Sequence, residues 1–213
     1  MVVGRCPHDT PMRTLSGEVI YSQKRENYPH ARSVFIDKKI LECYTKNRLF
    51  DVGEKRKMQQ YVLKMELKGS NLWREIAVSG GMNFSDLHNI IQTIFGWENK
   101  HLHRFMVGRL EIGDYEDEDD MPINFKYEGD ANIDLIFLNQ KTIQYEYDYG
   151  DGWQIEITVL EVKEIKKFAP PCVLKSEGGM AKDDCGGVDG LKELGEIPTN
   201  IDELNAILAY TYE

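Results

Sequence analysis

Residues 61–68 read Tyr-Val-Leu-Lys-Met-Glu-Leu-Lys, and residues 84–95 read Phe-Ser-Asp-Leu-His-Asn-Ile-Ile-Gln-Thr-Ile-Phe. In the first stretch apolar and charged side chains alternate, which is typical of a strand with one buried face. In the second stretch apolar residues recur every three or four positions, which predicts an amphipathic helix. Asn83 is suited to begin this helix and Gly96 to end it. Together the two patterns predict a domain that combines a sheet with a helix.

Further elements are expected on both sides of this pair. The strand-like stretches are residues 72–78, 101–110, 142–147 and 153–162, the helical ones are residues 133–138 and a final helix after Asn200, and residues 169–190 resemble a loop. No strand–helix–strand rhythm is sustained along the chain. We therefore expect an α+β fold, in which a mainly antiparallel or mixed sheet packs against the central amphipathic helix within a single core domain.

The N-terminal quarter of the chain differs from the rest. Residues 1–57 show weak periodicity and end in a linker-like run, Gly53-Glu-Lys-Arg-Lys57. We expect residues 1–57 to form an N-terminal extension that is weakly structured or holds a small β element. Residues 58–213 are expected to form the core α+β domain.

The composition is that of an ordinary globular protein. The 213 residues include 26 Lys or Arg and 36 Asp or Glu, which gives a net charge of −10, and 41% are hydrophobic. These values exclude collagen-like, low-complexity and wholly disordered chains. No apolar run is long enough to span a bilayer, and the first twenty residues hold no signal-peptide core, so we expect a cytoplasmic protein without membrane contact. The glycine pairs fit no nucleotide-binding motif.

Charge is spread unevenly along the chain. Residues 1–60 hold twelve Lys or Arg and seven Asp or Glu, a net of +5, whereas residues 111–134 hold ten acids and only Lys126 as a base. The run Asp114–Asp120 lacks the spacing of a calcium-binding loop, and we expect a solvated loop there. A chain this acidic is a poor binder of phosphate backbones, so only the basic N-terminal segment offers a face for nucleic acid.

Several short blocks carry a family likeness. In chain order they are Tyr61-Val-Leu-Lys, Leu72-Trp-Arg74, Leu87-His-x-x-Ile-Gln92, Phe95-Gly-Trp-Glu98, His101-Leu-His-x-Phe105, Tyr147-Asp-Tyr-Gly-Asp-x-Trp153 and Asp184-Cys-Gly-Gly187. With these blocks the chain resembles the plasmid pRiA4b ORF-3-like family of uncharacterised bacterial and archaeal proteins, over about residues 59–195. The chain departs from the family at Lys182-Asp183, where Pro-Glu is common, and at Leu191, where an aromatic residue is usual. The resemblance implies no established activity, although such proteins have been labelled resolvase-like and found near mobile elements.

Two histidines and two aspartates form the candidate metal site. His101 and His103 are two residues apart on an expected strand, so their side chains would share one face. Asp148 and Asp151 lie in the Gly-rich turn of an expected hairpin. If that hairpin lies beside the histidine strand, the four groups suit zinc, manganese or iron. The alternative is that the histidines pack in the core and the aspartates bond to the amides of their own turn.

Other candidate residues allow two interpretations each. Cys172 and Cys185 lack the tight spacing of most zinc frameworks, so they form either a secondary metal site or idle thiols. The aromatic residues and arginine of the family blocks form either a binding surface or the core between hairpin and helix. These residues are Trp73, Arg74, Trp97, Tyr149 and Trp153.

The function we favour is a non-catalytic binding or accessory module, so we lean against an enzyme. The first alternative is a metal-dependent hydrolase that uses His101, His103, Asp148 and Asp151. The second is a nucleic-acid accessory factor linked to mobile elements, which would act through the basic N-terminal segment. No cofactor is expected beyond the divalent metal of the first alternative. The partner expected is an unidentified protein or nucleic acid.

Overall fold

The computed structural model describes residues 12–13, 19–20, 58–115 and 121–212. The chain divides into two compact units, residues 1–37 and 38–213, and each is described by itself. In the first unit, β1 (Met12–Arg13) and β2 (Val19–Ile20) pair as antiparallel strands.

Three expectations fall outside the described residues. These are the linker-like run 53–57, the basic segment that precedes it, and residues 116–120 of the acidic run. The domain boundary expected between residues 57 and 58 stays a prediction.

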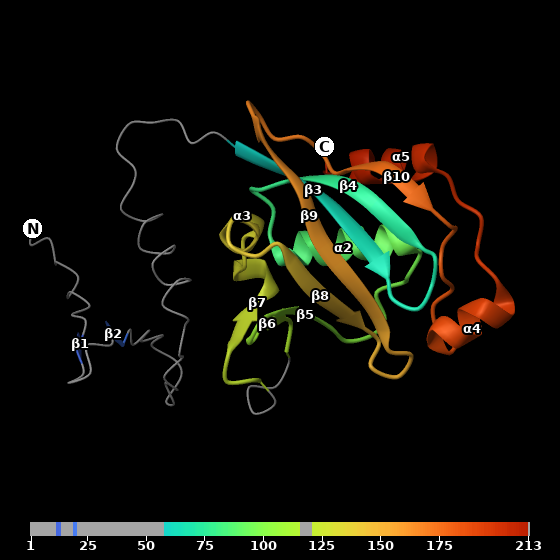
Figure 1. Cartoon of the computed structure of the whole chain (residues 1–213), viewed down its shortest axis with the longest axis horizontal. Helices are drawn as coiled ribbons and strands as arrows, with labels where there is room; N and C mark the ends of the chain where they lie inside the picture. The colour runs from blue at the N-terminus through green and yellow to red at the C-terminus, as the bar shows by residue number, and fades with distance from the viewer. Residues whose placement is uncertain (1–11, 14–18, 21–57, 116–120, 213) are drawn as a thin grey trace, which may run out of the picture. The chain divides into compact units, whose positions relative to one another are not determined.

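The second unit is built on one eight-stranded sheet (Figure 1). Its order is β10-β4-β3-β9-β8-β5-β6-β7, and every neighbouring pair is antiparallel except β6 and β7, which are parallel. The strands are β3 (Met58–Leu67), β4 (Trp73–Ser79), β5 (His103–Val107), β6 (Leu110–Gly113), β7 (Phe125–Tyr127), β8 (Thr142–Tyr147), β9 (Trp153–Ile165) and β10 (Cys172–Glu177). The helical segments are α2 (Phe84–Phe95), η2 (Glu128–Asp130), α3 (Ile133–Phe137), α4 (Gly187–Leu194) and α5 (Ile201–Tyr212).

The expected α+β architecture, with a sheet packed against one central amphipathic helix, is wrong. One mixed sheet of eight strands makes up most of the unit, and the helical segments are few and short. Part of this sheet could not be predicted from the sequence, because β10 is an edge strand. Only Val173 is buried in that strand, so it lacks the alternation that marks a half-buried strand, and it lies inside the stretch expected to be a loop.

Local patterns did predict the individual elements around β3. Tyr61, Leu63, Met65 and Leu67 point into the core, and the charged residues between them are on the other face. The hairpin to β4 is confirmed, as is the strand β8. One face of β3 therefore anchors the core of the sheet.

The helix α2 begins and ends where the sequence indicates. The Asn83 side chain accepts a hydrogen bond from the Asp86 amide, the Asp86 carboxylate accepts one from the Asn83 amide, and Gly96 adopts the left-handed conformation at φ 85°. Its buried side chains join the same hydrophobic cluster as those of the strands. Among the residues that the structure describes, no helix is both long and apolar enough to cross a bilayer.

Candidate functional site

Three segments far apart in the sequence meet at one end of the sheet. They are residues 97–102 between α2 and β5, the turn 148–152 between β8 and β9, and the loop 182–187 before α4 (Figure 1). The pairing of β5 with β8 joins the first two, since the Asp148 amide donates to the Leu102 carbonyl at 3.0 Å. Each of the three segments overlaps at least one of the family blocks quoted above.

The turn 148–152 is built as its composition predicts. Asp148 adopts a left-handed conformation, φ 52°, and its Oδ1 accepts a hydrogen bond of 2.9 Å from the Gly150 amide. The Gly152 amide donates to the Asp148 carbonyl at 2.6 Å. Aspartate tolerates this backbone conformation because its short side chain can bond locally. One carboxylate oxygen is thus used by the turn, and the other, Oδ2, points toward His101.

The loop 182–187 is fastened to that turn by Asp151. Its Oδ2 accepts a hydrogen bond of 3.0 Å from the Gly186 amide. Gly187 has φ 67°, and a Cβ there would collide with the Asp151 carbonyl. The backbones of the two segments therefore approach so closely that only glycine fits at this position. Asp151, expected to be a metal ligand, instead holds the loop in place.

A cluster of three ligating side chains results. Atoms of His101, Asp148 and Asp184 lie within 4.8 Å of one another. The Nε2 of His101 is 2.9 Å from Asp184 Oδ1 and 3.7 Å from Asp148 Oδ2. This nitrogen is buried and makes no hydrogen bond of acceptable direction with any residue that the structure describes. The cluster is half-open, because the Asp184 side chain is 60% exposed and that of Asp148 only 10%.

His103 lies in a different cluster, so pairing it with His101 in one metal site is corrected. The strand β5 begins at His103, which leaves His101 outside it, and the alternation of a strand does not relate the two rings. His103 Nε2 hydrogen-bonds Glu128 Oε2 at 2.6 Å, and its ring stacks on His88. Burial alone would raise the pKa of Glu128, but the hydrogen bond and charge of His103 outweigh it and lower that pKa.

His88 is buried in this second cluster. Its Nε2 pairs with Asn99 Oδ1 at 2.7 Å and its Nδ1 with the Tyr145 hydroxyl at 2.9 Å. Burial, with the neighbouring His103, lowers the pKa of His88 to about 4. Because Asn99 Oδ1 is an acceptor, His88 carries its proton on Nε2 and accepts from Tyr145. His88 is therefore neutral at physiological pH and is a structural residue of the core.

The two cysteines take part in no metal cluster of the described residues. Cys172 is exposed on the edge strand β10, and Cys185 is half-buried in the loop 182–187. The thiol of Cys185 faces the Gly187 carbonyl at 3.6 Å. Burial raises the pKa of this thiol, which disfavours the thiolate that metals require.

Three of the five residues expected to form a binding surface are buried, and that expectation is corrected for them. Trp97 and Trp153 pack against each other with ring centroids 5.3 Å apart. Arg74 is fully buried because its guanidinium bonds to backbone carbonyls, those of Trp73, Ile94, Glu177 and Gly179. Trp73 is half-exposed on β4, and Tyr149 is 45% exposed beneath Arg104 at 5.2 Å. The aromatic blocks therefore mainly build the core beneath the cluster.

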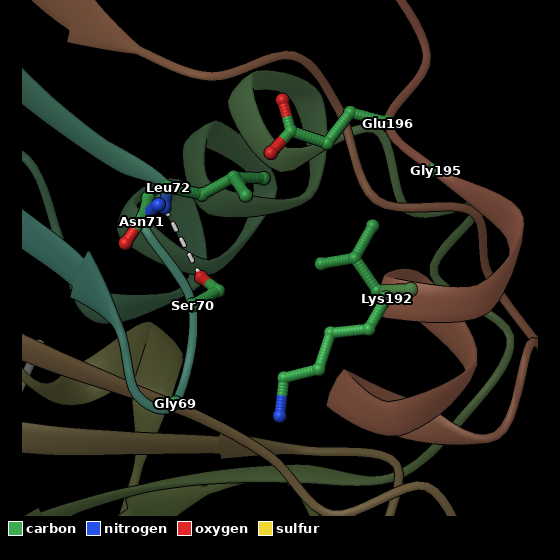
Figure 2. A pocket seen from close by; sticks show the side chains of 8 residues that line it. Gly69, Ser70, Asn71, Leu72, Lys192, Gly195 and Glu196 are labelled. Carbon is green, nitrogen blue, oxygen red and sulfur yellow. Dashed lines mark hydrogen bonds between the residues drawn. The ribbon is translucent and has the colours of Figure 1, made fainter.

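A hollow of the described surface lies elsewhere. Figure 2 shows it between the turn Gly69–Leu72 and α4, with the Lys192 side chain reaching into it and Glu196 on its upper side. Its volume is about 460 Å³. None of its lining residues belongs to the His101 cluster, and the Glu196 carboxylate is already used by the Gly179 amide at 2.6 Å. The three converging ligands are the better candidate site.

Two residues of the site were not predicted from the sequence. Asp184 was part of the block Asp184–Gly187, but only as a family likeness and not as a ligand. Asp183 is buried, and its Oδ2 accepts hydrogen bonds from the Tyr147 hydroxyl and the Glu98 amide. The signal available was the adjacency of two acids to a Cys-Gly-Gly turn.

The chain is similar to known proteins in sequence and in structure. A family model described as plasmid pRiA4b ORF-3-like protein matches residues 59–208. The chain belongs to this family. An uncharacterised family relative, y4hQ of Sinorhizobium fredii (strain NBRC 101917 / NGR234), is 29% identical over 128 residues, which is 58% of this chain and 63% of that protein. The chain thus matches less than two thirds of that relative's length.

A solved structure has the same fold. It is the crystal structure of MM3350, a protein of unknown function from Methanosarcina mazei Go1. The TM-score is 0.59 at 29% identity, and the match covers 75% of this chain and 92% of the other. Both relatives are without an assigned function, so the pRiA4b ORF-3-like family is at present one of uncharacterised proteins.

Proposed function

We propose that this pRiA4b ORF-3-like protein is a binding module for a divalent metal ion, held by His101, Asp148 and Asp184. The observation that carries the proposal is the convergence of these three groups, with the His101 nitrogen buried and without a hydrogen bond to the described residues. Two carboxylates this close repel each other, and a dication between them relieves that repulsion. The imidazole nitrogen of His101, which makes no hydrogen bond with the described residues, would bind the same ion.

The backbone conformation around the proposed ligands supports the same proposal. Among the described residues other than glycine, only Asn99, Asp148 and Asp184 have a positive φ, at 54°, 52° and 54°. Such conformations persist when surrounding contacts impose them, and they gather at ligand sites. Asp184 lies between Asp183 and Gly186, which are both hydrogen-bonded to other segments, so the loop that carries its exposed carboxylate is fastened on both sides.

The ligand types narrow the choice of ion. One imidazole nitrogen with two carboxylates suits zinc, manganese or ferrous iron, whereas calcium and magnesium prefer oxygen ligands alone. Three protein ligands also leave coordination positions open to water or to a partner's side chain.

Calorimetric titration with Zn²⁺ and Mn²⁺ of tag-free, chelator-treated protein tests the proposal. We expect one site per chain, and affinity at least about tenfold weaker in His101→Ala and Asp184→Asn. Asp189→Asn is the matched control, because Asp189 is an even more exposed carboxylate on the neighbouring α4. Absence of binding by the wild-type protein, or equal affinity in all variants, would refute the site.

A metal-dependent hydrolase is a second candidate, favoured by the half-open geometry. A bound ion with free positions lowers the pKa of a coordinated water and so supplies a nucleophile. Hydrolysis of p-nitrophenyl phosphate and p-nitrophenyl acetate in the presence of Zn²⁺ or Mn²⁺ tests this candidate. A rate that is the same for the wild type and His101→Ala would leave binding as the function.

A further inference from the structure

The three segments that supply the proposed ligands meet a second time on the inner side of the cluster. Each ligand has a neighbour in sequence that faces inward. The Tyr147 hydroxyl lies before Asp148, Asp183 lies before Asp184, and the amides of Glu98 and Lys100 precede His101. We call these inward-facing groups of Glu98, Lys100, Tyr147 and Asp183 the inner layer.

Hydrogen bonds join the inner layer into one unit. Asp183 Oδ2 accepts from the Tyr147 hydroxyl at 2.9 Å and from the Glu98 amide at 3.0 Å. The Tyr147 oxygen accepts from the Lys100 amide at 3.1 Å. All three ligand-bearing segments are therefore cross-linked directly behind the ligands. If one segment shifts, the others must follow, because lengthening any one of these hydrogen bonds would weaken it.

The inner layer also borders an aromatic cluster that has unused hydrogen-bonding groups. The Trp97 ring packs on the Tyr147 ring with centroids 5.1 Å apart, and Trp153 pairs with Tyr147 across β8 and β9. The indole nitrogens of Trp97 and Trp153 and the Oδ1 of Asp183 are buried without a hydrogen-bond partner among the described residues. Buried groups of this kind normally have partners, so small movements here have large energetic effects.

We propose that Asp183 and Tyr147 are positioning residues of the cation site, and that occupancy of the site is transmitted through them to the Trp97 indole. This inference rests on the proposed function. When an ion draws Asp184 toward His101 and Asp148, the adjoining Asp183 must move with the same loop. Its carboxylate then shifts against the Tyr147 hydroxyl, on whose ring Trp97 packs.

The charge of Asp183 is also expected to increase the affinity of the site for a cation. It is a third carboxylate directly behind two ligand carboxylates, and it is buried, so its field is weakly screened. Partners behind the ligands commonly change metal affinity by about 10- to 100-fold when they are removed. The same range is expected for Asp183→Asn, which keeps the shape of the side chain and loses its charge.

Zinc titration followed by tryptophan fluorescence tests the inference. Zn²⁺ is the suitable probe, because its filled d shell makes it redox-inactive. The background variant Trp73→Phe removes the tryptophan of β4, so that emission reports Trp97 and Trp153. We expect Zn²⁺ to change this emission, with the same midpoint as calorimetric binding. In Asp183→Asn we expect the midpoint to rise by about 10- to 100-fold.

Two further variants separate positioning from folding. Tyr147→Phe deletes one hydroxyl and keeps the ring, so it reports on the layer if Asp183→Asn fails to fold. Asp86→Asn is the matched control, since Asp86 also accepts a backbone amide, at 3.0 Å, but at the start of α2. It should lower the melting temperature and leave the zinc midpoint unchanged.

The outcomes are distinguishable. Weaker zinc binding in Asp183→Asn and Tyr147→Phe, with wild-type binding in Asp86→Asn, supports the inference. Zinc binding with unchanged midpoint and emission response in both inner-layer variants overturns it and leaves the cation site standing. No zinc binding by the parent protein overturns the proposed function and this inference together.

Discussion

The imidazole rings of His88 and His103 stack inside the domain with centroids 3.4 Å apart and planes 10° apart. Two rings at this distance cannot both be charged without strong repulsion. The surroundings of His88 keep its ring neutral. His103 faces the carboxylate of Glu128, whereas His88 is held by the uncharged groups of Asn99 and Tyr145.

This arrangement predicts how the pH changes the stability. The pKa of His88 is about 4 in the folded protein against an ordinary value of 6.5, because burial disfavours the charged ring. The unfolded chain therefore takes up the proton first as the pH falls. The contribution of neutral His88 is complete above about pH 6.5 and is lost toward pH 4, by about 3 kcal/mol in all.

Urea unfolding of the wild type and His88→Gln at pH 7, 5.5 and 4 measures this contribution. The free energy of unfolding of the wild type should fall more steeply with decreasing pH than that of the variant. Parallel curves for the two proteins would contradict the assignment of His88 as a neutral buried ring.

The second prediction concerns Arg74. Its guanidinium donates to the carbonyls of Ile94 and Glu177 at 3.2 and 2.7 Å, and it lies over the Phe95 ring. Arg74→Met leaves these buried carbonyls without a donor, so we expect a loss of about 3 kcal/mol or more in thermal or urea unfolding. Lys175→Met removes an exposed cation of the neighbouring strand and should cost less than about 1 kcal/mol. Comparable losses of stability in the two variants would show that the hydrogen bonds of Arg74 to α2 and β10 contribute little to stability.

The third prediction compares two glycines that both have a positive φ. Gly187 and Gly195 have φ of 67° and 80°, but a Cβ on Gly187 would meet the Asp151 carbonyl, whereas a Cβ on Gly195 would meet no atom within 4 Å. Gly195→Ala therefore costs only the backbone strain, about 1–3 kcal/mol. Gly187→Ala should cost clearly more and also weaken zinc binding, since it displaces the loop that holds Asp184. Equal melting temperatures for the two variants would argue against the close contact of the loop and the turn.

The fourth prediction concerns α2. Asn83→Ala removes the cap that holds the Asp86 amide, for about 1 kcal/mol. Ile91→Ala leaves a cavity at a fully buried position, for about 2–5 kcal/mol. Urea unfolding of both variants gives the two values directly. Similar small losses for both would mean that the buried face of α2 contributes little to the core.

Elements that arise from local interactions could be predicted from the sequence. Alternation around Lys64 predicts β3, the oxygen of Asn83 predicts the start of α2, and the aspartates and glycines of residues 148–152 predict a tight turn. In each case the residues that form the interaction are within a few positions of one another. Such interactions are legible from one stretch of chain, because no distant partner is needed to form them.

The composition of the His101 cluster, in contrast, depends on contacts between distant segments. His103 and Asp151 were grouped with His101 and Asp148, but β5 begins at His103, and the turn directs Asp151 to the amide of Gly186. The third ligand, Asp184, comes from a loop whose local sequence indicates only a turn. Strand pairing between β5 and β8 places His101 beside Asp148, and the contact of Asp151 with Gly186 brings Asp184 to both. No local pattern encodes which distant segments become neighbours, because that choice depends on how the whole chain buries its apolar surface.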